Sequence, residues 1–151
     1  MHCSEGEYRD KLSVDSAEAM LNYTIKNYKV VGLGASILNG YSYAPYTCCL
    51  PVYTSVKDMN DIRGFFFRFV YLEGYNEEIG YEGGNIPSPE RTICDYLMYP
   101  NKLCAYMYLV ETLEGYEDEY GNFDKVYEMM KLFNIPKDSL TLYINDMWCE
   151  D

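Results

Sequence analysis

The stretch from Ile86 to Pro100, IPSPERTICDYLMYP, constrains the fold of this chain most, because several independent helix signals coincide in it. Ser88 has a hydroxyl that can cap a helix, and Pro89 has the fixed φ and missing N–H that suit the first helical position. Glu90 faces the positive end of the helix dipole. The closing proline disfavours the α conformation at the residue before it. The sequence therefore predicts a short helix that begins at Pro89 and ends near Tyr99.

Two charged residues of this helix, Arg91 and Asp95, are four positions apart and can pair across one turn. Glu90 can reach a backbone donor near the helix start or a cation on a sheet. One interpretation is structural, with Ser88, Pro89, Glu90, Arg91 and Asp95 forming a network that fixes the helix on the sheet. The other is functional, with Arg91 presenting its planar guanidinium to a carboxylate or phosphate of a partner. Both interpretations stay open from the sequence.

The length and composition are those of one folded domain. A chain of 151 residues can bury about 70% of the surface that it exposes when unfolded, and 48% hydrophobic residues argue against disorder. We expect a flexible N-terminus over residues 1–12 and a single domain over residues 13–151. No apolar run approaches the ~20 residues of a membrane span, and no signal peptide opens the sequence. These features predict a cytoplasmic protein without a membrane partner.

Cysteine and histidine usage restricts the possible chemistry. The 6 cysteines include no C-x-x-C pair, which predicts reduced thiols rather than a zinc site. The single histidine, His2, leaves little room for histidine-based acid–base, triad or metal chemistry. A G-x-S-x-G motif and the acidic pair of a two-metal nuclease are also missing from the sequence. We therefore expect a protein that is not an enzyme and that uses no cofactor or metal.

The spacing of apolar residues predicts an α+β fold. In it, a small, strongly twisted β-sheet from the middle of the chain packs with N-terminal helices and a C-terminal helical half. Besides the central helix, we expect helices over Val14–Asn27, Gly34–Asn39, Asn101–Leu113 and Phe123–Phe133, and from a capping Asp138 to Trp148. We expect strands over Tyr46–Leu50, Val52–Ser55 and Phe65–Leu72, a turn over Lys57–Arg63, and a short strand around Gly80.

The net charge of −12 is distributed unevenly along the chain. Residues 1–75 contain seven basic and eight acidic residues, whereas residues 76–151 contain five basic and 16 acidic residues. A surface of this sign repels phosphate groups, so binding of duplex DNA by this chain alone is disfavoured. The charge could serve solubility alone. It could also form a face that attracts a basic partner or imitates nucleic acid.

The densest carboxylates lie just after Leu113, in a segment that we expect to be a solvated loop over Glu114–Asp124, with Gly115 marking the end of the preceding helix. A weak cation site is the alternative, although the segment lacks the order of an EF-hand. Two aromatics expected to be exposed lie among these acids, and exposed tyrosines are favoured at binding hot spots. The candidate partner-binding residues here are Glu114, Tyr116, Glu117, Asp118, Glu119 and Tyr120.

A second candidate surface contains Arg63, Arg68 and Arg91. Arg63 and Arg68 flank a run of aromatic residues, and aromatics interleaved with arginine can stack on unpaired bases. Solvated arginines beside buried aromatic strand residues would give the same pattern. The sequence leaves these two interpretations open.

One motif resembles a known family. Ser88 to Thr92, reading SPERT, followed by Asp95 and Leu97, is similar to the SPER-[AT]-xx-D-x-L signature of the AbiEi-type antitoxins of type IV toxin–antitoxin systems. Upstream, ASILNGY at 35–41 resembles that family's SAL-x-LHGL segment, with asparagine where the family often has histidine. The resemblance covers residues 29–147, which correspond to the family's C-terminal domain without its N-terminal winged helix-turn-helix.

The resemblance implies an antitoxin-like protein-binding module of a bacterial or phage defence locus that counteracts a nucleotidyltransferase toxin of the AbiEii type. It does not imply the family's autorepression of its own promoter, because the helix-turn-helix module is missing from this sequence. The alternative is an acidic, phage-encoded inhibitor or nucleic-acid mimic that blocks a host defence nuclease. In both cases the expected partner is a protein.

Overall fold

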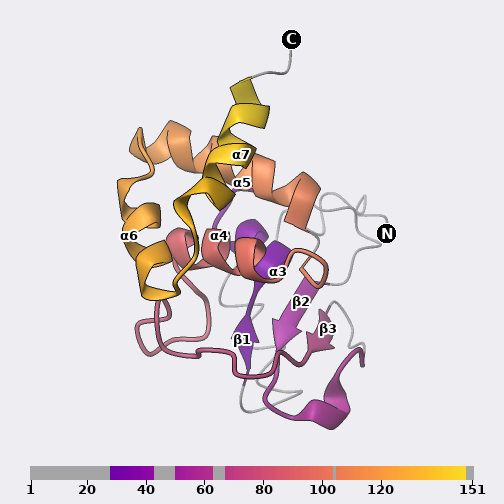
Figure 1. The fold of residues 1–151 in the computed structure, drawn as a ribbon. Coiled ribbons are helices and arrows are strands. Elements are labelled where there is room, and N and C mark those ends of the chain that lie inside the picture. Colours follow the sequence, from indigo (N-terminus) through magenta and orange to yellow (C-terminus); the bar gives the residue numbers. More distant parts are fainter. Residues whose placement is uncertain (1–27, 43–49, 63–66, 104, 149–151) are drawn as a thin grey trace, which may run out of the picture.

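The computed structural model describes residues 28–42, 50–62, 67–103 and 105–148, and it confirms the α+β fold. Figure 1 shows a helical layer above a small sheet, with α4 in the middle of the molecule. The elements in chain order are β1 (Lys29–Val30), α3 (Gly32–Leu38), β2 (Leu50–Tyr53), the 3₁₀ turn η1 (Lys57–Met59), β3 (Phe67–Val70), α4 (Pro89–Met98), α5 (Ala105–Tyr120), α6 (Asp124–Leu132) and α7 (Lys137–Trp148).

The sheet has three strands in the order β1-β2-β3, and it is mixed. β1 pairs with β2 in antiparallel fashion, whereas β2 and β3 are parallel, with Leu50 opposite Phe67. Loop segments cover both outer edges: the N–H of Val30 in β1 donates to the Asn85 carbonyl at 2.8 Å, and the N–H of Phe69 in β3 donates to the Ile62 carbonyl at 2.8 Å. Unpaired strand edges are templates for aggregation, and these loops close them.

The two faces of the sheet pack into two separate hydrophobic clusters, because successive side chains of a strand point to opposite faces. One face contributes Val52 and Phe69 to a cluster with Leu33 of α3. The other contributes Tyr53 and Val70 to the larger cluster, which contains the buried residues of α4, α5 and α6. The sheet is therefore covered on both sides. All residues of β2 are buried, whereas Lys29 of β1 and Arg68 of β3 are half-buried.

Helix α4 is the centre of the packing, since it contacts α3, α5 and α6. Its inward face is fully buried and includes Ile93 and Tyr96. A polar junction also ties three helices together: the Ser36 hydroxyl of α3 lies 2.9 Å from the Tyr96 hydroxyl of α4 and 2.9 Å from the Thr112 hydroxyl of α5. Buried hydroxyls that satisfy one another in this way fix how the helices pack.

Several expected elements are confirmed. α4 begins at Pro89, and the Ser88 side chain accepts a hydrogen bond from the Arg91 N–H at 3.2 Å, as a capping serine should. α3 contains most of the helix expected over Gly34–Asn39, and β3 lies inside the strand expected over Phe65–Leu72. α6 matches its expected bounds to within one residue at each end. The helix expected over Val14–Asn27 lies outside the described residues.

Two expectations about strands need correction. The segments Tyr46–Leu50 and Val52–Ser55 were separated by a proline, yet β2 runs without a break through Pro51, from Leu50 to Tyr53. Residues 43–49 lie outside the described part of the chain. The short strand expected around Gly80 is also wrong, since residues 71–88 form bends and turns.

The largest correction concerns the acidic segment, which is helix and not loop: α5 starts at Ala105 and runs through Gly115 to Tyr120. Gly115 permits close packing rather than ending the helix, because a Cβ built on it would lie 2.6 Å from a ring carbon of Tyr41. The helix ends at Gly121, which has a φ of +81° and donates its N–H to the Glu117 carbonyl at 2.8 Å.

The start of α7 also differs from the expectation. This helix begins one residue before Asp138, which lies in the first turn instead of capping it.

Candidate functional site

The C-terminal end of α5 carries the acidic cluster, here called the acidic helix end and consisting of Glu114, Glu117, Asp118 and Glu119. Glu114, Asp118 and Glu119 are exposed, and Glu117 is half-buried. The first three acids are at positions i, i+3 and i+4, so they share one face of the helix. The structure therefore brings together on one ordered surface the carboxylates that the sequence placed in a loop.

Tyr116 is not an exposed aromatic, which corrects the expectation. Its side chain is only 1% exposed, its hydroxyl donates to Glu90 Oε2 at 2.6 Å, and its ring stacks on Phe123 with centroids 5.8 Å apart. Tyr120 is 45% exposed, and the centroid of its ring lies 4.6 Å from that of Tyr116. Tyr116 thus anchors the end of α5, and Tyr120 is the aromatic that a partner could reach. The spacing from Leu109 and Leu113 to Tyr116 was the helical signal in the sequence.

A second tyrosine holds the other side of the acidic helix end. The hydroxyl of Tyr41, in the segment after α3, donates to the Glu119 carboxylate. Burial raises the pKa of Tyr41, and the adjoining Glu119 charge raises it further, so the phenol stays protonated and remains a donor. Tyr41 therefore positions Glu119 directly. Tyr116 positions the end of α5 by its hydrogen bond to Glu90 of α4.

The electrostatics of the acidic helix end are unfavourable to the helix itself. Carboxylates at a helix C-terminus face the negative end of the dipole, and α5 has no basic residue in its last turn. The ion pairs within the described ranges are Arg68 with Asp61 and Arg91 with Asp95, so none of the four carboxylates has an ion-pair partner there. One turn earlier, burial raises the pKa of Glu111, and the neighbouring charge of Glu114 raises it further.

Arg91 occupies the opposite environment, since its side chain is fully buried. Nε donates to Asp95 Oδ1 at 2.9 Å, Nη1 to the Ile79 carbonyl at 2.6 Å, and Nη2 to the Asn76 carbonyl at 2.7 Å. Its guanidinium carbon also lies 4.6 Å from the centroid of the Phe133 ring. All faces of the guanidinium are used internally, so the structure has the internal network and Arg91 is not available to a partner in this fold.

Asp95 and two tyrosines complete the network around Arg91. The Tyr75 hydroxyl donates to Asp95 Oδ2 and lies 2.7 Å from the Tyr81 hydroxyl, which in turn donates to the Val30 carbonyl of β1 at 2.9 Å. Burial raises the pKa of Asp95 to about 6, against the opposing effect of the Arg91 charge. We name Tyr75, Tyr81, Arg91 and Asp95 the arginine network, and it connects α4 to the 76–81 loop and to the sheet.

The remaining predicted residues are placed as follows. Glu90 does not reach a backbone donor or a cation on the sheet, because its partner is Tyr116. Arg68 lies at the sheet edge, 3.4 Å from Asp61 Oδ1 and 3.4 Å from the Lys102 carbonyl. Arg63 lies outside the described residues. Arg91 is fully buried, so it does not share an exposed surface with Arg68.

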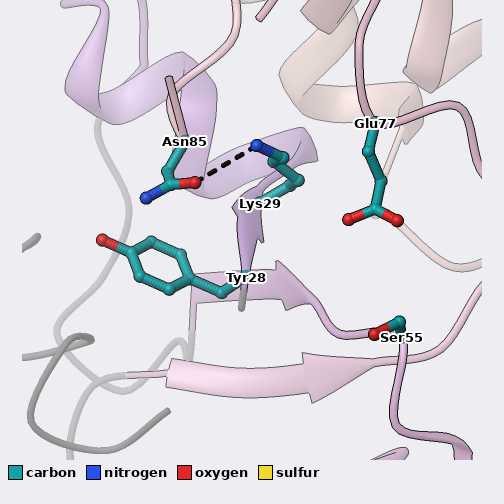
Figure 2. A pocket seen from close by; sticks show the side chains of 5 residues that line it. All are labelled: Tyr28, Lys29, Ser55, Glu77 and Asn85. Carbon is teal, nitrogen blue, oxygen red and sulfur yellow. Dashed lines mark hydrogen bonds between the residues drawn. The ribbon is translucent and has the colours of Figure 1, made fainter. Parts of the chain in front are cut away.

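Two of the hollows on the surface of the described residues contain a lysine and a glutamate. Figure 2 shows the first, of about 250 Å³, lined by Tyr28, Lys29, Ser55, Glu77 and Asn85. In it, the Lys29 ammonium already donates to Asn85 Oδ1 at 3.2 Å and to the Gly84 carbonyl at 2.7 Å, and it faces the Tyr81 ring. Lys29 therefore attaches the segment of Gly84 and Asn85 to β1. The second hollow, of about 320 Å³, is lined by Lys57, Asn60, Tyr71, Glu73 and Lys102.

Among the described residues, no three His, Cys, Asp or Glu side chains are grouped as a metal site would require, so the cation-site alternative for residues 114–124 gains no support. Within the same ranges, no helix has the length and apolar character needed to cross a membrane. Comparison of the chain with protein-family models, curated proteins and solved structures finds no match. The function is therefore inferred from the geometry and chemistry of these residues.

Proposed function

We propose that this protein is a protein-binding module without catalytic activity, and that it docks a basic protein partner through the acidic helix end. One observation carries the proposal: Glu117, Asp118 and Glu119 lie at the negative end of the α5 dipole with no basic residue in the last turn. Each acid there costs the helix about 0.3–1 kcal/mol. A charge pattern that works against its own helix is typical of a functional surface rather than a stabilising one.

The geometry of the surface supports the same reading. The acids are held on an ordered helix by Tyr41 and by Tyr116, so a partner would meet a preorganised surface and not a loop that has to be ordered first. Tyr120 adds an exposed aromatic beside the carboxylates, a residue type that is common at hot spots. Clustered charge also accelerates association with a partner of opposite sign.

For the partner, we propose a nucleotidyltransferase toxin of the AbiEii type, which the chain would counteract as an antitoxin. The support is the resemblance of the segment around Ser88 to the antitoxin signature, and it is independent of the charge. An acidic inhibitor that occupies the basic groove of a defence nuclease is the second candidate. The acid density of α5 supports this alternative, because unpaired carboxylates on one helix face resemble a phosphate backbone.

The test neutralises the acidic helix end without changing side-chain shape, in the triple variant Glu117→Gln, Asp118→Asn, Glu119→Gln. Glutamine at 119 still accepts the Tyr41 hydrogen bond. We expect this variant to lose protection of cells against a nucleotidyltransferase encoded beside it, and its association rate to fall by about tenfold or more at low salt. We expect its stability to stay equal or rise, since the dipole penalty is removed.

The matched control is the triple variant Glu77→Gln, Glu78→Gln, Glu82→Gln, which removes the same number of charges from exposed positions of the 76–84 loop. It should protect cells as the unchanged protein does. Full protection by the α5 variant would refute the proposed surface, and equal loss in both variants would show that net charge alone matters. Protection from a nuclease instead of a nucleotidyltransferase would decide for the second candidate.

A further inference from the structure

The second hollow brings together side chains from three separate parts of the chain. Lys57 and Asn60 come from η1 and its end, Tyr71 and Glu73 follow β3, and Lys102 lies in the turn between α4 and α5. In Figure 1, η1 lies at the bottom of the molecule, whereas the C-terminal end of α5 lies near the top. The hollow is therefore remote from the acidic helix end, and it needs its own explanation.

The two lysines of this hollow differ from Lys29 in the first one. Lys29 has its ammonium satisfied by a carbonyl, an amide oxygen and an aromatic face. Within the described ranges, the Lys57 and Lys102 ammonium groups have no hydrogen-bond or ion-pair partner. Two such cations at one hollow, in a chain of net charge −12, form a local site for an anion.

The other lining groups restrict which anion fits. Asn60 uses its oxygen to accept the Tyr71 N–H at 2.9 Å, which leaves its amide NH₂ as a donor. Glu73 adds a carboxylate to the same hollow, and it repels a bare anion unless the ligand also offers hydrogen-bond donors. Tyr71 adds a partly buried side wall. The chemistry is that of a ligand with an anionic end and a hydroxyl-bearing end.

We propose that this hollow binds a small phosphate monoester whose organic part carries hydroxyl groups, a sugar phosphate or a ribonucleotide. Lys57 and Lys102 hold the phosphate oxygens, Asn60 donates to one of them, and Glu73 accepts from the hydroxyls. The volume of about 320 Å³ is at the lower end of small-molecule sites, which matches a ligand of this size. A long polyanion is disfavoured, because the exposed carboxylates of Asp58 and Asp61 lie on the same segment as Lys57.

Binding is measured by calorimetry and by chemical-shift perturbation of the isotope-labelled chain, with three probes: ribose 5-phosphate, inorganic phosphate and ribose. We expect ribose 5-phosphate to bind with a dissociation constant on the order of 1 mM, as for an open site and a ligand of few atoms. Inorganic phosphate should bind more weakly, and ribose not measurably. Binding should be tighter above the second phosphate pKa of about 6 than below it.

Paired variants separate the site from general charge. The double variant Lys57→Gln, Lys102→Gln should raise the dissociation constant for ribose 5-phosphate by about tenfold or more, since two charge-assisted contacts are lost. Lys125→Gln with Lys131→Gln removes the same charge from exposed positions of α6 and should leave affinity within about twofold. Glu73→Ala removes both the negative charge and the hydrogen-bond acceptor, so it should strengthen binding of inorganic phosphate and abolish the advantage of ribose 5-phosphate over it.

The proposal is overturned if ribose 5-phosphate gives no saturable binding, or if the α6 variant loses as much affinity as the Lys57 and Lys102 variant. It is also overturned if Glu73→Ala strengthens the binding of both phosphate ligands equally, because the carboxylate would then act only by repulsion. A single-stranded RNA that binds far more tightly than ribose 5-phosphate would show a polyanion surface in place of a small-molecule site. All the changed side chains are exposed, so unfolding does not confuse the outcome.

Discussion

Removing the Arg91 side chain should destabilise this protein far more than removing any exposed arginine. Arg91→Ala eliminates three hydrogen bonds from a buried cation, at 2.9, 2.6 and 2.7 Å, and leaves Asp95 buried without its counter-ion. Breaking a buried ion pair from one side costs about 3–5 kcal/mol. Contacts with the Tyr75 and Phe133 rings are lost as well. We therefore expect the free energy of unfolding to fall by about 4–5 kcal/mol.

The assay is urea unfolding at neutral pH, followed by circular dichroism. With a slope of about 2 kcal/mol per molar urea, the midpoint of Arg91→Ala should fall by about 2 M. Arg91→Lys keeps the charge but not the planar fork, and it should lose about half as much. Arg68→Ala is the control, because its bond to Asp61 is 3.4 Å long and the Asp61 side chain is 70% exposed. A loss below about 1 kcal/mol is expected there.

A double-mutant cycle tests the reasoning and not only the magnitude. In the Arg91→Ala background, Asp95→Ala should cost much less than in the unchanged protein, since the carboxylate has already lost its counter-ion. Equal unfolding midpoints for Arg91→Ala and Arg68→Ala would refute the internal network. Additivity of the Arg91 and Asp95 changes would refute their pairing even if each is destabilising.

Two further predictions concern the same network. Gly80→Ala should cost about 2–4 kcal/mol in the same urea assay, because Gly80 has a φ of +83° and a Cβ there would lie 2.4 Å from Arg91 Cβ. Gly83→Ala, at a φ of +79° with open space around it, should cost only the backbone strain of about 1 kcal/mol, and equal losses would contradict the clash. Asp95 has a raised folded pKa of about 6, so it is protonated more readily in the folded than in the unfolded chain. The stabilisation from this proton uptake is fully present below the unfolded pKa of about 3.9. The free energy of unfolding then falls by about 3 kcal/mol as the pH rises through 6. Asp95→Asn should remove this part of the pH dependence, and unchanged pH profiles of unfolding would contradict it.

The sequence predicted the central helix well because the signals for it are local. The Ser88 cap, the proline after it and the i, i+4 spacing of Arg91 and Asp95 all act within about two helical turns. The sequence did not show which groups accept hydrogen bonds from the other guanidinium nitrogens of Arg91. Their acceptors are carbonyls of Asn76 and Ile79, which belong to a loop without any periodic pattern. Only the fold determines which backbone carbonyls meet a buried side chain.

Glycine gave the main error, and the reason is physical. Gly115 was interpreted as the end of a helix, because glycine often ends one. The same residue is equally suited to close packing, and here it lies against the Tyr41 ring. The pair is distant in the sequence, so no local rule distinguishes these two roles. With the helix ended too early, Tyr116 was assigned to a solvated loop, although its spacing continues the buried face of Leu109 and Leu113.

The antitoxin-like motif and the acidic helix end do different work in this fold, and this bears on what the motif can indicate. Arg91 and Asp95 point inward and hold the 76–81 loop, while Glu90 holds Tyr116 and so positions the end of α5. A resemblance that rests on these residues therefore concerns the framework. Partner choice would depend on exposed side chains such as Asp118 and Tyr120, which can change without disturbing the brace. Chains that share the motif should then share the packing of α4 and α5 while differing in the partners that they bind.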